Sequence, residues 1–305
     1  MVHIQVTNLK RGSIGLAGVL SLVSLLAVPL GSAAADSMST LKANDTFRYV
    51  ALGDSVAAGL GLSPVSNATT EDTACGRSPQ AYSTTVADGI NAQLSKIRLH
   101  LVSSNVACQG AVVGNLTGPQ TVGPLTVRPQ LDAAFAAGTP ALLTLTIGAN
   151  DVHWSNFIGA CFSAANCDTT ENTAAAHAYV ATMQNQLTDT LASIRSRSAY
   201  GLAPITVVTG YYNPVSTQCV NPNLSIDEVN WLTAVTAGFN TALQAASHNA
   251  GWFAKFAPVD FTGHDICSAD PWIQRPGVAG EPAAFHPNAQ GQKAMGNDVL
   301  HVLGL

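Results

Sequence analysis

The sequence predicts an α/β protein, a three-layer α/β/α sandwich around a mainly parallel sheet of roughly five strands. Short apolar segments alternate with longer amphipathic segments along most of the chain, and parallel neighbouring strands need such crossover connections. The clearest apolar segment, 141–147, is nearly continuous, as in a strand that is buried on both faces of a parallel sheet. We therefore expect helices on both faces of the sheet.

The expected strands are short apolar runs that lead into small or polar residues. The first run ends at Gly53, the third at Gly148, and the fourth begins at Pro204. The fifth is the weakest, because its run is short and is followed by an irregular segment. The expected strands are 47–52, 97–102, 141–147, 204–209 and 256–259.

The expected helices have apolar residues at helical spacing. The first begins at Pro79, because proline suits a first helical turn, and its apolar residues recur every four positions from Tyr82 to Leu94. The last begins near Asn288, which is a good helix cap. The expected helices are 79–94, 130–137, 173–198, 226–248 and 288–303, and the expected loops include 116–129, 152–172 and 260–285.

The first 35 residues have the pattern of an export signal. Lys10 and Arg11 precede an apolar run over 14–30, and three alanines over 33–35 fit a cleavage site. A transmembrane anchor is the alternative, because the run is nearly long enough to span a bilayer. Pro29 and the lack of basic residues directly after the run favour cleavage. We expect a signal peptide over 1–35 and a single secreted domain over 36–305.

The charge balance excludes some classes of partner. Lys and Arg number 13 against 18 Asp and Glu, and the leader removes two of the basic residues. An acidic mature chain without a basic patch argues against nucleic acid and against anionic membranes. We expect no nucleic-acid partner, no stable membrane anchor and a monomer.

The six cysteines all follow the leader, and their even number suits an oxidising compartment. Six cysteines permit 15 pairings. Pairing between neighbours would fasten three successive loops and is our preferred interpretation: Cys75–Cys108, Cys161–Cys167 and Cys219–Cys267. Zinc is a competing interpretation, disfavoured because the cysteines lack metal-type spacing and the histidines are not clustered with them.

Three strand ends carry residues that suit acyl transfer. Ser55 follows the first strand, Gly110 the second and Asn150 the third, and His286 precedes the last helix. The carboxyl ends of parallel strands meet at one edge of a sheet, so these residues can share a cleft. Ser55 could attack, His286 could act as general base, and the N–H groups of Ser55 and Gly110 with the Asn150 amide could form an oxyanion hole. Taken alone, the turn at Ser55 would more simply be a helix cap.

Four sequence blocks resemble the GDSL/SGNH hydrolase family. They are GDS at 53–55, Gly110 in CQGA, GAND at 148–151 and His286 in FHPNAQGQ. The resemblance implies a flavodoxin-like fold, a serine esterase mechanism without metal or organic cofactor, and the oxyanion donors given above. The neighbour disulfides and the FHPN segment further resemble the secreted actinobacterial-type lipases and esterases.

The chain departs from the family pattern at one position. The family often has Asp three residues before the histidine, whereas Ala283 stands there. We expect the backbone carbonyl of Ala283 or Ala284 to accept from His286 Nδ1–H, which would fix the tautomer but would stabilise imidazolium less than a carboxylate. Side-chain acids remain as alternatives: Glu281, Asp270 and Asp265.

These observations predict a secreted serine esterase or lipase that acts on a small-molecule or lipid ester. A carbohydrate O-acetyl deacetylase and a catalytically silent binding protein on the same fold are the alternatives. His153 is a minor candidate for a substrate contact, because a loop histidine is usually solvated. Arg77 could meet a carboxylate or phosphate of the substrate, but a single arginine is more often a surface or loop-bracing residue. Five loop aromatics are expected either to line an acyl pocket or to pack over the core: Trp154, Phe157, Tyr211, Tyr212 and Trp272.

Overall fold

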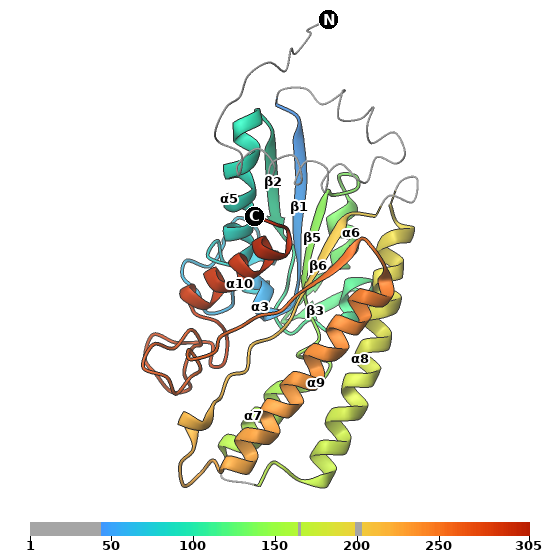
Figure 1. Cartoon of the computed structure of the whole chain (residues 1–305). Coiled ribbons are helices and arrows are strands. Elements are labelled where there is room, and N and C mark those ends of the chain that lie inside the picture. Colours follow the sequence, from blue (N-terminus) through green and yellow to red (C-terminus); the bar gives the residue numbers. More distant parts are fainter. Residues whose placement is uncertain (1–43, 164–165, 199–202) are drawn as a thin grey trace, which may run out of the picture.

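A computed structural model describes residues 44–163, 166–198 and 203–305. The expected signal peptide, 1–35, lies outside the described residues. Five parallel strands form the main sheet in the order β2-β1-β5-β6-β7 (Figure 1). This is the strand order of flavodoxin-like folds, as expected. The strands are β1 (Thr46–Gly53), β2 (His100–Asn105), β5 (Leu142–Thr146), β6 (Ile205–Thr209) and β7 (Ala254–Ala257).

Helices cover both faces of this sheet. On one face α5 packs against α10, and on the other α8 packs against α9 (Figure 1). Right-handed crossovers between parallel strands produce this arrangement. These helices are α5 (Tyr82–Leu94), α8 (Thr170–Ser196), α9 (Ile226–Ala250) and α10 (Ala289–Val302), and the short α6 (Gln130–Phe135) leads into β5.

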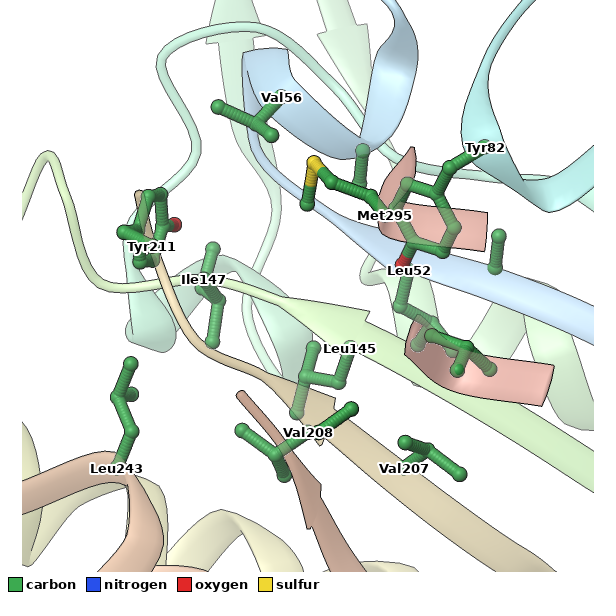
Figure 2. Packing of buried hydrophobic residues seen from close by; sticks show 14 of the residues in the cluster. Leu52, Val56, Tyr82, Leu145, Ile147, Val207, Val208, Tyr211, Leu243 and Met295 are labelled. Atoms are coloured by element: carbon green, nitrogen blue, oxygen red, sulfur yellow. The ribbon is translucent and has the colours of Figure 1, made fainter. Parts of the chain in front are cut away.

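The core lies between the sheet and these helices. Figure 2 shows Leu145 and Val208 of the sheet in one buried cluster with Met295 of α10 and Leu243 of α9. All five residues of β5 and of β6 are buried, which explains why the sequence showed these strands as continuous apolar runs. The sheet thereby gives a rigid support to the loops at its carboxyl edge.

The structure corrects the expectation for the second strand. The expected range was 97–102, whereas Ser95–Ile97 is a 3₁₀ turn and β2 covers His100–Asn105. Arg98 takes a left-handed conformation, with φ of 59°, and separates the two. β2 is an edge strand in which most residues are exposed, so its hydrophobic pattern gave little information about register.

Two regions expected to be loops contain regular structure, as does the segment between β1 and α5. The segment after β5 forms α7 (Trp154–Phe162), and 116–129 contains the hairpin of β3 (Gln120–Val122) and β4 (Leu125–Val127). The loop after the first strand contains α3 (Ser55–Ala58) and α4 (Thr70–Cys75). Among the described residues, no helix has both the length and the apolar character needed to span a membrane.

Three disulfides join neighbouring cysteines: Cys75–Cys108, Cys161–Cys167 and Cys219–Cys267. The first joins the end of α4 to the residue that lies two positions before Gly110. Asp265 lies close to the third, and both sulfurs there belong to the disulfide. The sulfurs of this cluster are therefore not free to bind zinc.

Candidate active site

The turn after β1 places Ser55 at the carboxyl edge of the sheet. Gly53 has a φ of 138°, and a Cβ there would lie 1.9 Å from the carbonyl oxygen of Thr146, so only glycine allows this close approach to β5. Asp54 donates its N–H to the same oxygen at 2.9 Å. Its carboxylate accepts from the N–H of Val56 at 2.9 Å and caps α3. Asp54 is therefore the helix cap, which agrees with the simpler interpretation of the turn, and Ser55 is the first helical residue.

His286 lies directly opposite Ser55. Its Nε2 is 2.7 Å from Ser55 Oγ, and its Nδ1 is 3.0 Å from the carbonyl oxygen of Ala284. The Ala283 carbonyl accepts instead from the backbone N–H of His286 at 3.1 Å. Desolvation by the surrounding protein lowers the pKa of His286 below 6.5, against the opposing effect of the two carbonyls. The ring is thus kept neutral near neutral pH.

The other two sequence blocks lie against each other beside Ser55. The Asn150 side-chain amide donates to the Ala111 carbonyl at 2.8 Å. The Asp151 carboxylate accepts from the N–H of Val113 with both oxygens, at 3.0 and 3.1 Å. These bonds attach the loop after β2 to the loop after β5. Gly110 of the first loop is exposed and has a φ of 73°.

Several donors at this edge remain available. Within the described part of the chain, the N–H groups of Ser55 and Gly110 have no hydrogen-bond acceptor. Asn150 uses one bond from its amide nitrogen for Ala111, and the second amide proton is left for another acceptor. The three groups lie on the loops that follow β1, β2 and β5, at the edge where ligands bind in open α/β sheets.

Comparison with known proteins identifies the family. Residues 51–294 match the sequence profile of the GDSL-like Lipase/Acylhydrolase family. The chain belongs to this family. A curated relative, Lipase 2 of Streptomyces coelicolor, is 31% identical over 301 residues, which cover 93% of this chain and 94% of the relative. The GDSL-like family membership makes the protein a carboxylic ester hydrolase.

Solved structures agree with this assignment. The extracellular lipase of Streptomyces rimosus superposes with a TM-score of 0.66 at 25% identity, covering 84% of this chain and 99% of that chain. Phospholipase A1 of Streptomyces albidoflavus superposes with a TM-score of 0.62 at 25% identity, covering 84% and 98%. The GDSL-like hydrolase therefore groups with the actinobacterial lipases.

The three side-chain acids considered for a triad bond elsewhere in this GDSL-like hydrolase. Glu281 pairs with Arg275, at 2.6 Å between carboxylate and guanidinium. Asp265 is buried and accepts from the N–H of Cys267 at 2.8 Å. Asp270 lies 3.4 Å from His264 Nδ1. Within the described residues, the hydrogen-bond partner of His286 Nδ1 is a carbonyl and no carboxylate.

Two acidic groups beside the site have shifted pKa values. Burial raises the pKa of Asp54 to about 7, although hydrogen bonds from Tyr211 and the backbone oppose the shift. Burial likewise raises the pKa of Asp151 to about 6, against the hydrogen bond from Val113. Such carboxyl groups are costly to ionise and cluster at functional sites. Tyr211 was considered in the sequence only as a loop aromatic, because its bond to Asp54 spans 157 positions and leaves no local signal.

The loop aromatics mostly pack against protein. Phe157 is buried and makes an edge contact with Trp231, with ring centroids 5.4 Å apart. Trp272 stacks on His264 at 3.6 Å. An aromatic pair that the sequence did not indicate lies beside His286, where Phe162 of α7 contacts Phe285 at 5.3 Å.

Two other sequence candidates also have structural partners. His153 is the N-cap residue of α7, and its ring lies 4.6 Å from that of Tyr179. Arg77 is buried and bonds to the carboxylates of Glu71 and Asp72 and to the Ala107 carbonyl. Arg77 thus braces the loop around the first disulfide, in agreement with its interpretation from the sequence.

Proposed function

We propose that this protein hydrolyses its ester through an acyl-enzyme on Ser55, with His286 as the general base. The observation that carries the proposal is the contact of 2.7 Å between Ser55 Oγ and His286 Nε2. When Nδ1–H donates to the Ala284 carbonyl, Nε2 is the unprotonated nitrogen and can accept the serine proton. The lowered pKa of His286 keeps this base free at neutral pH.

The reaction then follows the acyl-transfer sequence. Ser55 Oγ attacks the ester carbonyl carbon as its proton passes to His286, and the carbonyl oxygen becomes an oxyanion. The N–H groups of Ser55 and Gly110 and the second amide proton of Asn150 are the donors that would stabilise it. His286 returns the proton to the leaving alcohol. Water then attacks the acyl-enzyme by the same route and releases the acid.

The Ala284 carbonyl takes the orienting role that a carboxylate has in a triad. It accepts from Nδ1–H at 3.0 Å and so selects the productive tautomer. It carries no formal charge, so imidazolium gains less stabilisation than from a carboxylate. The proposed catalytic machinery is therefore a Ser55–His286 dyad, and the oxyanion donors supply most of the electrostatic stabilisation.

Fatty acyl esters are the proposed substrate class. The similar proteins are named lipases and a phospholipase A1, and the apolar pair of Phe162 and Phe285 next to His286 suits an acyl chain. We also propose that residues 36–305 form one secreted, monomeric domain after removal of 1–35. The disulfides support an oxidising destination, as does the extracellular location of the Streptomyces rimosus lipase.

Hydrolysis of p-nitrophenyl esters from acetyl to palmitoyl tests both the chemistry and the substrate class. Purified protein from residue 36 onward should turn over long-chain esters, and Ser55→Ala should lower kcat by about 10³-fold or more. Ser103→Ala, on the exposed edge strand β2, is the matched control and should keep the wild-type rate. Activity on acetyl esters alone would favour a carbohydrate deacetylase. Retention of the rate by a folded Ser55→Ala variant would reject the mechanism.

A further inference from the structure

Two consecutive tyrosines connect the two halves of the proposed dyad. Tyr211 and Tyr212 follow β6 and are 4% and 5% exposed. The Tyr211 hydroxyl donates to the carboxylate of Asp54, the residue before Ser55. The Tyr212 hydroxyl donates to the carbonyl of Phe285, the residue before His286, at 2.6 Å. We propose that this pair holds Ser55 and His286 in register, an inference that rests on the dyad proposed above.

The two tyrosines extend from one fixed point of the backbone. The Asn240 side chain of α9 accepts from the Tyr211 N–H at 2.8 Å and donates to the Tyr211 carbonyl at 2.7 Å. The preceding residue, Gly210, donates its N–H to the Ala257 carbonyl of β7 at 2.8 Å. The tyrosines are therefore anchored to a helix and to the sheet, and movement of one hydroxyl relative to the other is restricted.

The Tyr211 hydroxyl acts on the nucleophile turn. The Asp54 carboxylate accepts hydrogen bonds from this hydroxyl and from the N–H of Val56. It thereby fixes both neighbours of Ser55 in the chain, Asp54 and Val56. The Tyr211 oxygen also accepts from the N–H of Ala149 at 3.4 Å, next to Asn150. One phenol thus links the Ser55 turn to an oxyanion loop, and its ring stacks on Phe239 at 4.9 Å.

The Tyr212 hydroxyl acts on the histidine loop. Phe285 has a φ of 64°, a left-handed conformation that a phenylalanine adopts only when its surroundings enforce it. The Tyr212 hydroxyl holds the Phe285 carbonyl, while the Phe285 N–H donates to the Gln274 carbonyl at 2.8 Å. Phe285 lies between Ala284 and His286 in the chain, so its backbone conformation sets how His286 Nδ1 is directed at the Ala284 carbonyl. The Tyr212 ring is itself fixed by stacking on Phe261 at 4.6 Å and 10°.

Tyr212→Phe tests the proposal because it removes the hydroxyl and keeps the stacked ring. We expect kcat to fall about tenfold with KM within twofold of wild type, since small misplacement of a reacting group costs rate. We also expect the proton NMR signal of His286 Nδ1–H to shift or broaden. Tyr49→Phe is the matched control, because it removes a buried tyrosine hydroxyl that bonds Thr144 within the sheet, at 2.8 Å. It should lower Tm to a similar degree and leave kcat and the Nδ1–H signal unchanged.

The Tyr211 hydroxyl is tested by a double-mutant cycle with Asp54. Tyr211→Phe should lower kcat about tenfold in the wild-type background and have less than a twofold effect beside Asp54→Ala, because alanine removes the acceptor and the two groups act through one bond. If Tyr212→Phe fails to fold, the coupling in kcat between Tyr211 and Asp54 tests the proposal on its own. Additive losses in the cycle would overturn the proposal, as would wild-type kcat in a folded Tyr212→Phe or an equal loss in Tyr49→Phe.

The activity of Ser55→Ala distinguishes an error in the proposed dyad from an error in the proposed role of the tyrosines. If the dyad were wrong, Ser55→Ala would keep its activity and would still react with a fluorophosphonate probe. If only the inference were wrong, Ser55→Ala would be inactive while the tyrosine variants kept the wild-type kcat. Both tyrosine variants should retain the far-ultraviolet circular dichroism and the cooperative urea unfolding of the folded protein.

Discussion

Replacement of Asp54 by asparagine should make the protein more stable at neutral pH, although Asp54 lies beside the proposed nucleophile. Asp54 is completely buried, and burial raises the pKa of its carboxyl group from 3.8 to about 7. Between these two pH values the folded protein keeps a proton that the unfolded chain has released. The stability that this group contributes is therefore greatest below about pH 4 and is lost as the pH rises toward 7.

The size of this effect follows from the same pKa values. The interval from 3.8 to about 7 is about three pH units, and each unit corresponds to about 1.4 kcal/mol, so complete ionisation costs about 4 kcal/mol. Between pH 5 and pH 8 the wild type should lose about 3 kcal/mol through this group. Asparagine has nearly the shape of the protonated aspartic acid and does not titrate. The stability advantage of Asp54→Asn over wild type should therefore widen by about 3 kcal/mol over this range.

Urea denaturation at pH 5, 6.5 and 8 with the disulfides intact measures this difference. The dependence of the unfolding free energy on urea should keep the same slope in both proteins, so that the midpoints report stability. Asp151, with a pKa of about 6, is present in both proteins, so most of its own contribution cancels, and its charge is one of the lesser causes that raise the pKa of Asp54. Asp88→Asn, at an exposed position on α5, is the matched control for the replacement of an aspartate by asparagine. A constant or shrinking advantage of Asp54→Asn would refute the reasoning.

Two further substitutions test the oxyanion loop and the orientation of His286. Gly110→Ala should lower kcat about tenfold with little change in KM. The atom nearest to a new Cβ is Gln120 Nε2 at 3.8 Å, so space is available, but the φ of 73° costs about 1–2 kcal/mol for alanine and should displace the N–H of residue 110. Unchanged steady-state rates would show that Gly110 is not part of the oxyanion hole. Glu281→Gln should keep kcat within twofold, because Glu281 bonds Arg275, whereas loss of a triad carboxylate lowers kcat about 10⁴-fold. A loss of that order in a folded variant would mean that Glu281, and not the Ala284 carbonyl, orients His286.

The central sheet could be predicted from the sequence because burial on both faces leaves a strong signal. The apolar runs at 141–147 and 204–209 correspond to β5 and β6, which are buried throughout. The edge strand β2 was placed three residues too early. In that region Leu101 is buried, whereas Ile97 is 37% exposed and Val102 is 58% exposed. Apolar residues on an exposed edge carry little information about register.

The elements that the sequence missed depend on contacts with distant parts of the chain. The hairpin of β3 and β4 lies in a segment rich in Gly, Pro and Thr, which favours a loop. Gln120 at its start donates to the Gln109 carbonyl at 2.7 Å, and Gln109 in turn donates to the Ala74 carbonyl at 2.7 Å. With the disulfide between Cys75 and Cys108, these bonds hold the loop that presents Gly110. Local propensity contains none of this information.

The site shows a similar division. The position of Ser55, Gly110 and Asn150 at one edge of the sheet could be predicted because each follows the carboxyl end of a parallel strand, and topology brings such ends together. The bonds of Tyr211 and Tyr212 could not, because their acceptors lie 157 and 73 positions away. Tyrosines after a strand have the same sequence pattern whether they pack, bind substrate or donate a hydrogen bond.

Within the described residues, His286 Nδ1 contacts a carbonyl and no carboxylate, and several backbone hydrogen bonds fix the loop around it. A carbonyl accepts a hydrogen bond but lacks the charge that draws an imidazole into place, so the backbone must set the direction of the Ala284 carbonyl. Gln274 makes two backbone hydrogen bonds to this loop: its N–H donates to the His286 carbonyl at 2.7 Å, and its carbonyl accepts from the N–H of Phe285 at 2.8 Å. The Gln274 side chain adds a bond from the Ala283 N–H at 3.2 Å. In a triad one acid orients the base, whereas in the proposed dyad several backbone bonds would share that function, and their loss should affect rate before it affects substrate binding.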